Sequence, residues 1–590
     1  SARVGAATVS SQGLALGATT DGTGRNTVST SATSGAAGGN TSVAGALAIG
    51  VGISRFEASL APTAVVNGHT GVVTLEAESA TADTVKALPD GGGAVAENTG
   101  VGASVAINVA DHLSRAELEN GASLGASGAL TLDARTDSAI TTTAEGGAKG
   151  GTAVAPVVAV TVANQDSIAR IGTGSLVNAA GAITIASQLD STNTTQAEGK
   201  AEGSKDAAVG AAIAVNIEND KSLASSARSL QSSGAIGFSA GNTASSKASA
   251  KASAVGGKED DSNSAADDKA VDDQNATARN SGNAAAGAAG ARDASSSQAT
   301  PSAQGTGGGT VSVAAAVAVN VAQATSRATA GGGTLSAAGA VSIDSKTDTD
   351  ASAVADGASR AKDAANPNDT GVGVGVAVNV GINTNEARLL GDAVVASQGV
   401  NVRAGMGSGA SSAGTHTNAA TAKSGAGGAK TGIAGALAVN VAVDRTTAEI
   451  ATGASVDAGS GASTISAKSV HADSASATPA DSGVQADAKN TGVGASVAVN
   501  VPDTIARAEI ADGAVLSRSA ALTVSGTLEN TIATTAEGGA KGETAVAPVV
   551  AVTVANQDAI ARIGSGATTA ATGQVNVASS LKSTNTTKAE

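Results

Sequence analysis

Residues 370–381 read TGVGVGVAVNVG, and valine occupies every second position from Val372 to Val380. The positions between these valines hold glycine, alanine or asparagine. This alternation predicts a β-strand, because successive side chains of a strand point to opposite faces. A half-buried strand carries polar groups on its second face, whereas this strand carries almost no side chains there. We expect the valines to form a ridge inside a coil and the bare face to touch a second sheet at short range.

The composition of the chain favours a repetitive architecture. Its 590 residues include 77 glycines, two phenylalanines and no tryptophan or tyrosine. Several globular domains of this total size would use many aromatic residues in their cores, because each aromatic ring buries a large apolar area. Small side chains pack densely only where backbones approach one another closely and regularly, which is typical of repeat proteins.

The sequence repeats in units of about 55 residues, and an asparagine in the motif AVNV, or its equivalent, marks each unit. These anchor positions are Gly50, Asn108, Thr161, Asn216, Asn320, Asn379, Asn440, Asn500 and Thr553. Consecutive anchors lie 53 to 61 residues apart except for one step of 104, and alanine stands eight positions after every anchor. Each unit reads as strand, short connection, strand and glycine turn, and we expect about four short strands in it.

These features predict an all-β protein with an elongated, repetitive β-solenoid fold, in which each unit contacts its neighbours. Residues 1–40 form a partial repeat, and residues 41–244 and 308–590 form the solenoid repeats. Residues 245–307 form an acidic segment rich in serine and glycine, with few branched aliphatic residues. Such a segment cannot bury enough apolar surface to order itself, so we expect a low-complexity insertion looped away from the solenoid. Whether each unit forms one rung or two stays open.

Two sets of polar residues recur at fixed positions of the unit. Asparagine at the anchor can hydrogen-bond to the asparagine one rung away in an in-register stack, so we expect a ladder of amides. One position after the repeated alanine, charges of opposite sign follow in neighbouring units. These pairs are Glu117 with Arg170, Arg388 with Glu449, and Glu509 with Arg562. They form a charge ladder if units stack in register, and the alternative is scattered surface charge.

The sequence offers no catalytic, cofactor-binding or metal-binding constellation, and we predict that the protein is not an enzyme. Its four histidines, His69, His112, His416 and His471, show no matching acid or nucleophile in the sequence pattern. A cluster of aspartates raises the alternative of Ca²⁺ binding by the insertion. Its members are Asp260, Asp261, Asp267, Asp268, Asp272 and Asp273. No ligand motif supports Ca²⁺ binding, and a solvated acidic run is the preferred interpretation.

The formal net charge of −15 argues against nucleic acid and anionic lipid as partners, because an acidic surface repels both. No apolar run reaches the roughly 18 residues of a membrane-spanning helix. The first residues, SARVGAATVSSQG, start in the middle of the repeat pattern, so we expect an internal segment of a longer protein. The absence of cysteine excludes disulfides and zinc thiolates.

The unit GASVAVNV, followed by AEGGAKGG between units, resembles the repeats of very large Gram-negative surface proteins, the filamentous adhesin and leukotoxin-like β-strand-repeat family. The resemblance implies an extracellular or cell-surface protein that forms a fibre, a stalk or a self-associating filament for adhesion, a biofilm matrix or a sheath. Its partners would be neighbouring copies of itself, with cell-surface or matrix ligands as a further option. The alternative is a toxin or pore-related role, which would require a membrane-active apolar segment.

Overall fold

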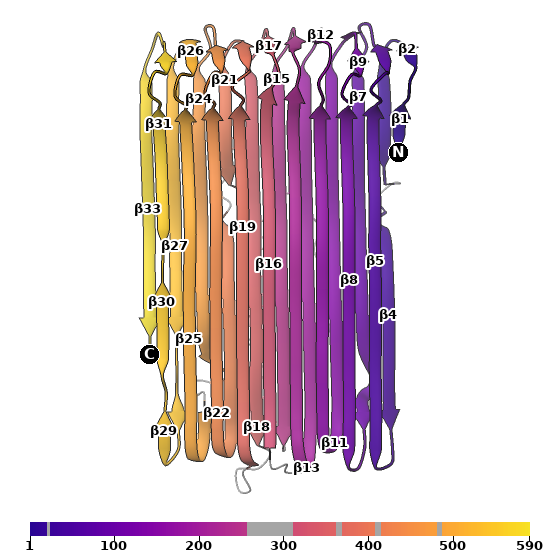
Figure 1. Cartoon of the computed structure of the whole chain (residues 1–590), viewed down its shortest axis with the longest axis vertical. Helices are drawn as coiled ribbons and strands as arrows, with labels where there is room; N and C mark the ends of the chain where they lie inside the picture. Colours follow the sequence, from indigo (N-terminus) through magenta and orange to yellow (C-terminus); the bar gives the residue numbers. More distant parts are fainter. Residues whose placement is uncertain (21–23, 257–310, 362–367, 407–414, 481–485) are drawn as a thin grey trace.

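Each sequence unit folds into one flattened coil of long β-strands, and successive coils stack side by side (Figure 1). The computed structural model describes residues 1–20, 24–256, 311–361, 368–406, 415–480 and 486–590. Strand pairing between neighbouring coils is parallel, and the described residues form no helix. The all-β solenoid predicted from the period-two alternation is therefore confirmed.

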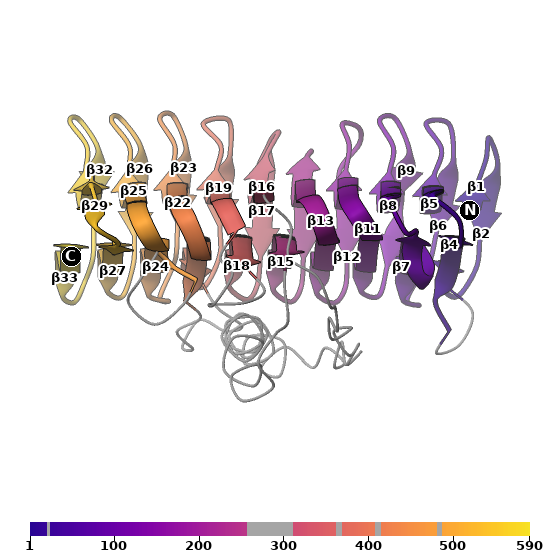
Figure 2. The same ribbon diagram turned by 90° about the horizontal axis from the view of Figure 1, so that it is seen from below.

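Each coil, or rung, has two long arms that face each other across a narrow interior (Figure 2). We call the layer of arms that carry the anchors the valine wall, which lies in front in Figure 1. It contains β5 (Thr41–Leu60), β8 (Thr99–Leu118), β16 (Val311–Gly331), β19 (Asn368–Leu389), β25 (Ala486–Ile510), β29 (Thr544–Val546), β30 (Val549–Thr553), β31 (Asn556–Ile563), and the C-terminal parts of β11 (Leu130–Ile171), β13 (Ile183–Ala227) and β22 (His416–Ile450).

The opposite layer is called the serine/threonine wall after the residues on its outer face. It contains β3 (Leu14–Thr19), β4 (Asn26–Ala37), β7 (Val73–Val95), β15 (Ile236–Gly256), β18 (Val341–Ala361), β21 (Val400–Met406), β24 (Ser463–Pro479), β27 (Leu522–Ala536), β33 (Val575–Ala589), and the N-terminal parts of β11, β13 and β22. Short end strands are β1 (Ala2–Val4), paired with β5, and β28 (Ala540–Lys541), paired with β25.

Short strands at the tips of the rungs join the two walls. They form a three-stranded sheet of β2 (Thr8–Ser10), β6 (Val65–Asn67) and β9 (Ser123–Leu124), and an eight-stranded sheet of β10 (Ala126–Ser127), β12 (Val177–Ala179), β14 (Leu230–Ser232), β17 (Thr334–Ala337), β20 (Val394–Ala396), β23 (Ser455–Asp457), β26 (Val515–Arg518) and β32 (Thr568–Thr569). A unit therefore contains two long arms and a short tip, and the prediction of about four short strands is wrong.

The strand register shows that one sequence unit makes one rung. Asn379 pairs with Asn320 on one side and with Asn440 on the other. Asn216 pairs directly with Asn320 although 104 residues separate them, so the longest step between anchors adds no further rung. The longest axis of the molecule follows the strands, and the two termini lie at opposite ends of the stack (Figures 1 and 2).

The start of the predicted insertion needs correction. Strand β15 continues to Gly256, so residues 245–256 belong to the serine/threonine wall and not to an insertion. Small residues of this segment, such as Ala248 and Ala252, are buried between the walls, which explains how a stretch with a single branched aliphatic residue is ordered. The rest of the predicted insertion, with its cluster of aspartates, lies outside the described residues.

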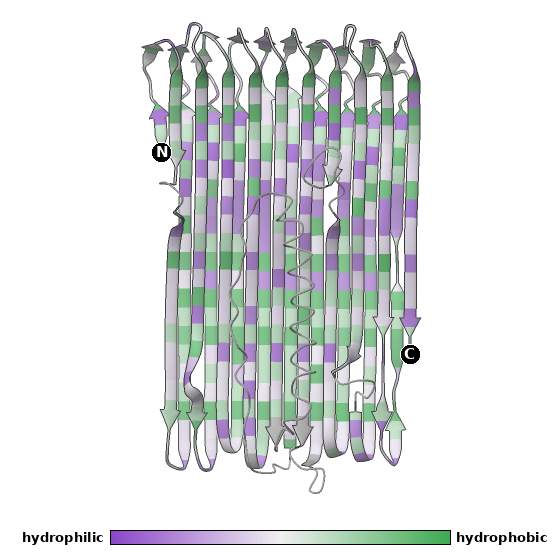
Figure 3. Ribbon diagram, turned by 180° about the vertical axis from the view of Figure 1, so that it is seen from behind, coloured by the Kyte–Doolittle hydropathy of each residue, from purple (hydrophilic) through white to green (hydrophobic). Residues whose placement is uncertain are grey.

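The interior changes character along the strands. Near the tips it contains leucine, isoleucine and valine, including the leucine or isoleucine that stands two positions beyond seven of the nine repeated alanines. At the opposite end of the arms it consists almost entirely of alanine, with glycine between. A band of polar side chains separates the two apolar zones, and Figure 3 shows hydrophilic residues gathered in the half of the serine/threonine wall nearer the tips.

The valines point outward, which is opposite to the prediction. Along β19 the buried positions are the bare ones, and the valines between them are partly exposed. A Cβ atom added to Gly375 would lie 2.0 Å from the backbone oxygen of Lys423 in the opposite wall, so the bare face does touch a second sheet at short range. Along this part of β19 the walls approach so closely that the inner face carries glycine, alanine and asparagine, and the larger valines point away from the interior.

Candidate functional site

The polar band inside the solenoid brings buried hydroxyl, amide, carboxyl and imidazole side chains together, and it is the candidate site. The valine wall contributes the anchor and the residue four positions after it, which is polar in most rungs. The serine/threonine wall contributes inward-facing threonine, serine, asparagine, aspartate and histidine. Buried polar groups require partners, so the contacts among these side chains determine what the band can do.

The predicted asparagine ladder is present. Asn320 donates a hydrogen bond from its amide nitrogen to the Oδ1 atom of Asn379 at 2.9 Å, and Asn379 donates in the same way to Asn440 at 2.9 Å. The ladder extends from Asn216 to Asn500 with bonds of 3.0 Å at both ends. These five side chains are completely buried, so each amide satisfies its neighbour in a region that water does not reach.

The histidines have acidic and hydroxyl partners, contrary to the sequence prediction. His112 lies 3.0 Å from Asp83 across the interior, and both side chains are 1% exposed. His416 and His471 occupy paired positions of neighbouring rungs, and their ring centroids are 5.4 Å apart. His69 lies instead near the tips, where its ring is 2.9 Å from the hydroxyl of Ser10.

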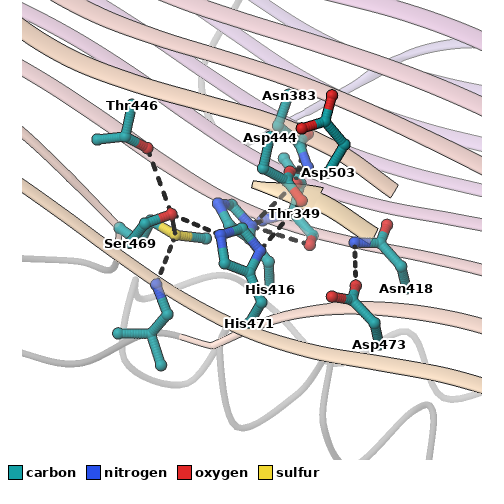
Figure 4. Close-up of polar contacts among 12 residues, drawn as sticks. Thr349, Asn383, His416, Asn418, Asp444, Thr446, Ser469, His471, Asp473 and Asp503 are labelled. Atoms are coloured by element: carbon teal, nitrogen blue, oxygen red, sulfur yellow. Dashed lines mark hydrogen bonds and ion pairs between the residues drawn. The ribbon is translucent and has the colours of Figure 1, made fainter. Parts of the chain in front are cut away.

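The cluster around His416 and His471 connects both walls (Figure 4). The carboxylate of Asp444, from the valine wall, lies 3.1 Å from Nδ1 of His471. The amide of Asn383, one rung away, donates to the other carboxylate oxygen at 2.5 Å. On the remaining side of the same ring, the hydroxyl of Ser469 lies 2.5 Å from Nε2.

Burial and charge together set the ionisation of this cluster. Burial opposes protonation of His471, but the neighbouring carboxylates of Asp444 and Asp473 outweigh it and raise the His471 pKa. Burial, together with the charge on His471, lowers the pKa of His416 to about 3, so this ring is neutral at pH 7. Burial raises the pKa of Asp473 to about 6. The carboxylates therefore favour the protonated form of His471, whereas burial favours the neutral form of His416.

Ser469, His471 and Asp444 lie in the order of a catalytic triad, which sequence reasoning missed, but the contact between His471 and Asp444 is an ion pair without hydrogen-bond geometry. Their exposed fractions are 0%, 2% and 1%, and the hydroxyl of Ser469 also lies 3.1 Å from the sulfur of Met406. In this packed environment the geometry supports a buried ionic network that joins rungs. A signal for it was available, because Asp444 stands four positions after its anchor, as His112 does in an earlier unit.

A second cluster contains two carboxyl groups. The hydroxyl of Ser191 lies 2.8 Å from Glu218 and 2.5 Å from Asp220, and all three side chains are buried. Burial raises the pKa of Asp220 well above its ordinary value, and the nearby charge of Glu218 raises it further. Burial also raises the pKa of Glu218. Protonation of one carboxyl group lets the pair remain between the walls, because two adjacent buried carboxylates repel each other.

The predicted charge ladder runs along the outward side of the strands toward the tips, where Glu117 and Glu509 are themselves buried. The guanidinium of Arg388 is 2.8 Å from the carboxylate of Glu449. Arg170 forms an ion pair with Glu117, and Arg562 forms the equivalent pair with Glu509. All three predicted pairs join neighbouring rungs, so the in-register interpretation is confirmed over that of scattered charge.

The described residues include no group of three or more histidine, cysteine or acidic side chains arranged to hold a metal ion. In the same residues, no helix could span a membrane. No family model matches the chain, and no curated protein or solved structure is significantly similar to it.

Proposed function

We propose that the chain is a structural ribbon of a secreted bacterial surface protein, which builds a fibre, a biofilm matrix or a sheath. The observation that carries this proposal is the uniform register of the stack. Each rung pairs only with the rungs beside it, and the same ladders continue from unit to unit. A repeat protein of this kind becomes longer when units are added, because each new unit extends the same continuous core.

The shape of the rung favours a role in building surfaces over a role in reaching across distance. Neighbouring strands of a sheet are about 4.8 Å apart, so a unit of 53 to 61 residues advances the stack by only about that much. Each arm of about 20 residues is about 65 Å long. The ribbon is therefore broad and gains little length from each unit, which suits a coat or matrix better than a slender stalk.

The interior chemistry supports the same proposal. The asparagine ladder and the histidine–aspartate cluster each bond neighbouring rungs, and their side chains lie between the walls. Buried polar contacts of this kind fix which residues pair, because a shift by one residue would leave amides and carboxylates without partners. We assign them to the register of the ribbon.

Surface labelling tests the proposal. Antibodies raised against the purified chain should label intact, unpermeabilised cells of the source organism, and brief protease treatment of those cells should remove the label. Deletion of the coding region should also reduce matrix or sheath material seen by electron microscopy. Antigen detected only after lysis would contradict the proposal.

A further inference from the structure

We propose that the outer face of the valine wall is the docking site for a second copy of this chain, which binds it face to face. This inference builds on the proposed ribbon, because it names the surface through which ribbons associate. Four outward positions of each unit form this surface. They lie seven, three and one residues before the anchor, and one residue after it. In β8 they are Val101, Val105, Ile107 and Val109.

These four positions hold valine, isoleucine or leucine in all nine anchored units. The strand register places equivalent positions side by side, so Val105 pairs with Val158, which in turn pairs with Ile213. Four aliphatic ridges therefore run across the whole stack. Folding of the single chain does not explain them, because the interior is filled from the opposite side of the same strands.

The ridges form a larger apolar surface than a monomer ordinarily exposes. Ile213 and Ile217 are 41% exposed, and Val162 is 39% exposed. All three belong to rungs that have a neighbouring rung on both sides. The ridges span nine residues along the strand and nine strands across, a geometric footprint of about 26 Å by 38 Å, or roughly 1,000 Å². Exposed patches on monomers reach about 300–600 Å², whereas a stable dimer buries about 800 Å² on each partner.

The surface is self-complementary. The outward position five before the anchor holds glycine, alanine or proline in eight of the nine units, so a groove runs between two ridges. A two-fold axis parallel to the stack reverses the strand direction and places the ridge three before the anchor of one copy over the groove five before the anchor of the other, while the ridges one and seven before the anchor meet each other. No outward residue from nine positions before the anchor to one after it is charged. The charged side chains that give the net charge of −15 therefore lie outside the contact.

A lipid surface is the other apolar partner that such a face could meet. Membrane-binding surfaces use basic residues for anionic headgroups and tryptophan or tyrosine at the interface. This chain contains neither tryptophan nor tyrosine and is acidic overall. Its own second copy offers the matching flat and uncharged face, so the observations favour self-association.

Sedimentation velocity of the full chain, measured from low to high micromolar concentration, tests this inference. The triple variant Val105→Glu, Val158→Glu, Ile213→Glu places three carboxylates on one ridge of adjacent rungs. We expect it to weaken self-association by about 100-fold or more, because charge buried in an apolar contact is costly. A matched control adds the same charge to the same three rungs on the outer face of the opposite wall: Thr84→Glu, Thr141→Glu, Thr194→Glu. This control should associate as the unaltered chain does.

The triple variant Val105→Thr, Val158→Thr, Ile213→Thr keeps the branched shape that β-strands favour and guards against misfolding of the glutamate variant. It should weaken association by a smaller factor without lowering the melting temperature measured by circular dichroism. An unaltered chain that stays monomeric, or association that the valine-wall variants leave unchanged, would overturn the inference. So would a monomer that binds neutral phosphatidylcholine vesicles through this face. Cell-surface labelling is a separate measurement, so failure of the proposed function would be recognised independently.

Discussion

The two faces of β19 follow opposite packing rules, although they belong to the same backbone. The inner face carries Gly373, Gly375 and Ala377 against the opposite wall, and the outer face carries valines that stay partly exposed. In an ordinary strand, the larger apolar residues would face the core. Here the spacing of the walls decides the orientation, so the size of a side chain determines its face more strongly than its hydrophobicity.

The largest effect that this comparison predicts is at Gly375. Replacement by leucine would place Cβ 2.0 Å from the backbone oxygen of Lys423, and neither wall can move without disturbing its neighbours. Overpacking of a dense interior costs up to about 3 kcal/mol, so we expect Gly375→Leu to lower the free energy of unfolding by about that amount or more. Thermal melting followed by circular dichroism measures the change.

The matched control for this change is Val376→Leu, on the outer face of the adjacent position. A surface substitution of this kind usually changes stability by less than about 0.5 kcal/mol. Equal losses for the two variants would mean that both faces are packed in the isolated molecule. An unaffected Gly375→Leu protein would show that the walls stand farther apart than the structure describes.

The asparagine ladder gives the next largest effect. Asn379→Leu would remove the Oδ1 acceptor of the Asn320 amide and the donor to Oδ1 of Asn440, so each of these buried amides would lose one of its hydrogen bonds. An unsatisfied buried polar group costs about 1–3 kcal/mol, and we expect a loss in that range. Denaturant unfolding measures it. Asn379→Thr is the control, since Thr161 occupies an anchor in the natural chain, and it should lose less stability. A loss as large as that of the leucine variant would indicate that volume, and not hydrogen bonding, matters at the anchor.

Much of the fold could be predicted from the sequence because the repeat fixes the register. The anchors, the asparagine ladder and the charge pairs all depend on which residue of one unit faces the equivalent residue of the next. Spacing alone determines that. The contact of the glycine face with a second sheet was also predictable, because close approach is what a face without side chains permits.

The orientation of the valines could not be predicted by the usual rule. Alternation separates two faces, but it identifies the inner face only when the other face is polar. In TGVGVGVAVNVG both faces are nonpolar, so the rule fails. The histidine cluster was missed for a different reason: its residues come from separate arms, and their contacts depend on how the two walls face each other. The anchor spacing of the valine wall does not determine this.

Burial of ionisable groups on the inner face predicts a dependence of stability on pH. The pKa of Asp473 is about 6 when folded, against an ordinary value of 3.8. Between these values the folded state binds more protons than the unfolded state, so stability falls as the pH rises from about 4 to about 6 and stays reduced above that. Asp473→Asn should therefore match the unaltered protein near pH 4 and exceed its free energy of unfolding by about 1–2 kcal/mol at pH 8.

Urea unfolding at both pH values tests this prediction. The neighbouring Ser474 points outward, so Ser474→Asn serves as a control and should produce the same small change at both pH values. A stability gain for Asp473→Asn that does not depend on pH would mean that the ionisation of this carboxyl group is unchanged by folding.

The smallest predicted effect concerns the charge ladder of the outer rim. Glu117 is nearly buried, and Arg170 keeps 42% of its side chain exposed, so solvent screens the pair only in part. A double-mutant cycle with Glu117→Gln and Arg170→Gln should give a coupling energy of about 0.5–1 kcal/mol that decreases at high salt. Glu509 and Arg562 repeat the pair in the last described rungs, and a cycle there offers an internal replicate. Coupling near zero in both cycles would leave the asparagine ladder as the main polar determinant of register. The rim pairs join only neighbouring rungs, whereas the histidine–aspartate cluster of the interior also joins the two walls. If the rim pairs show weak coupling and the interior cluster shows strong coupling, the residues on the inner face of the strands determine the register.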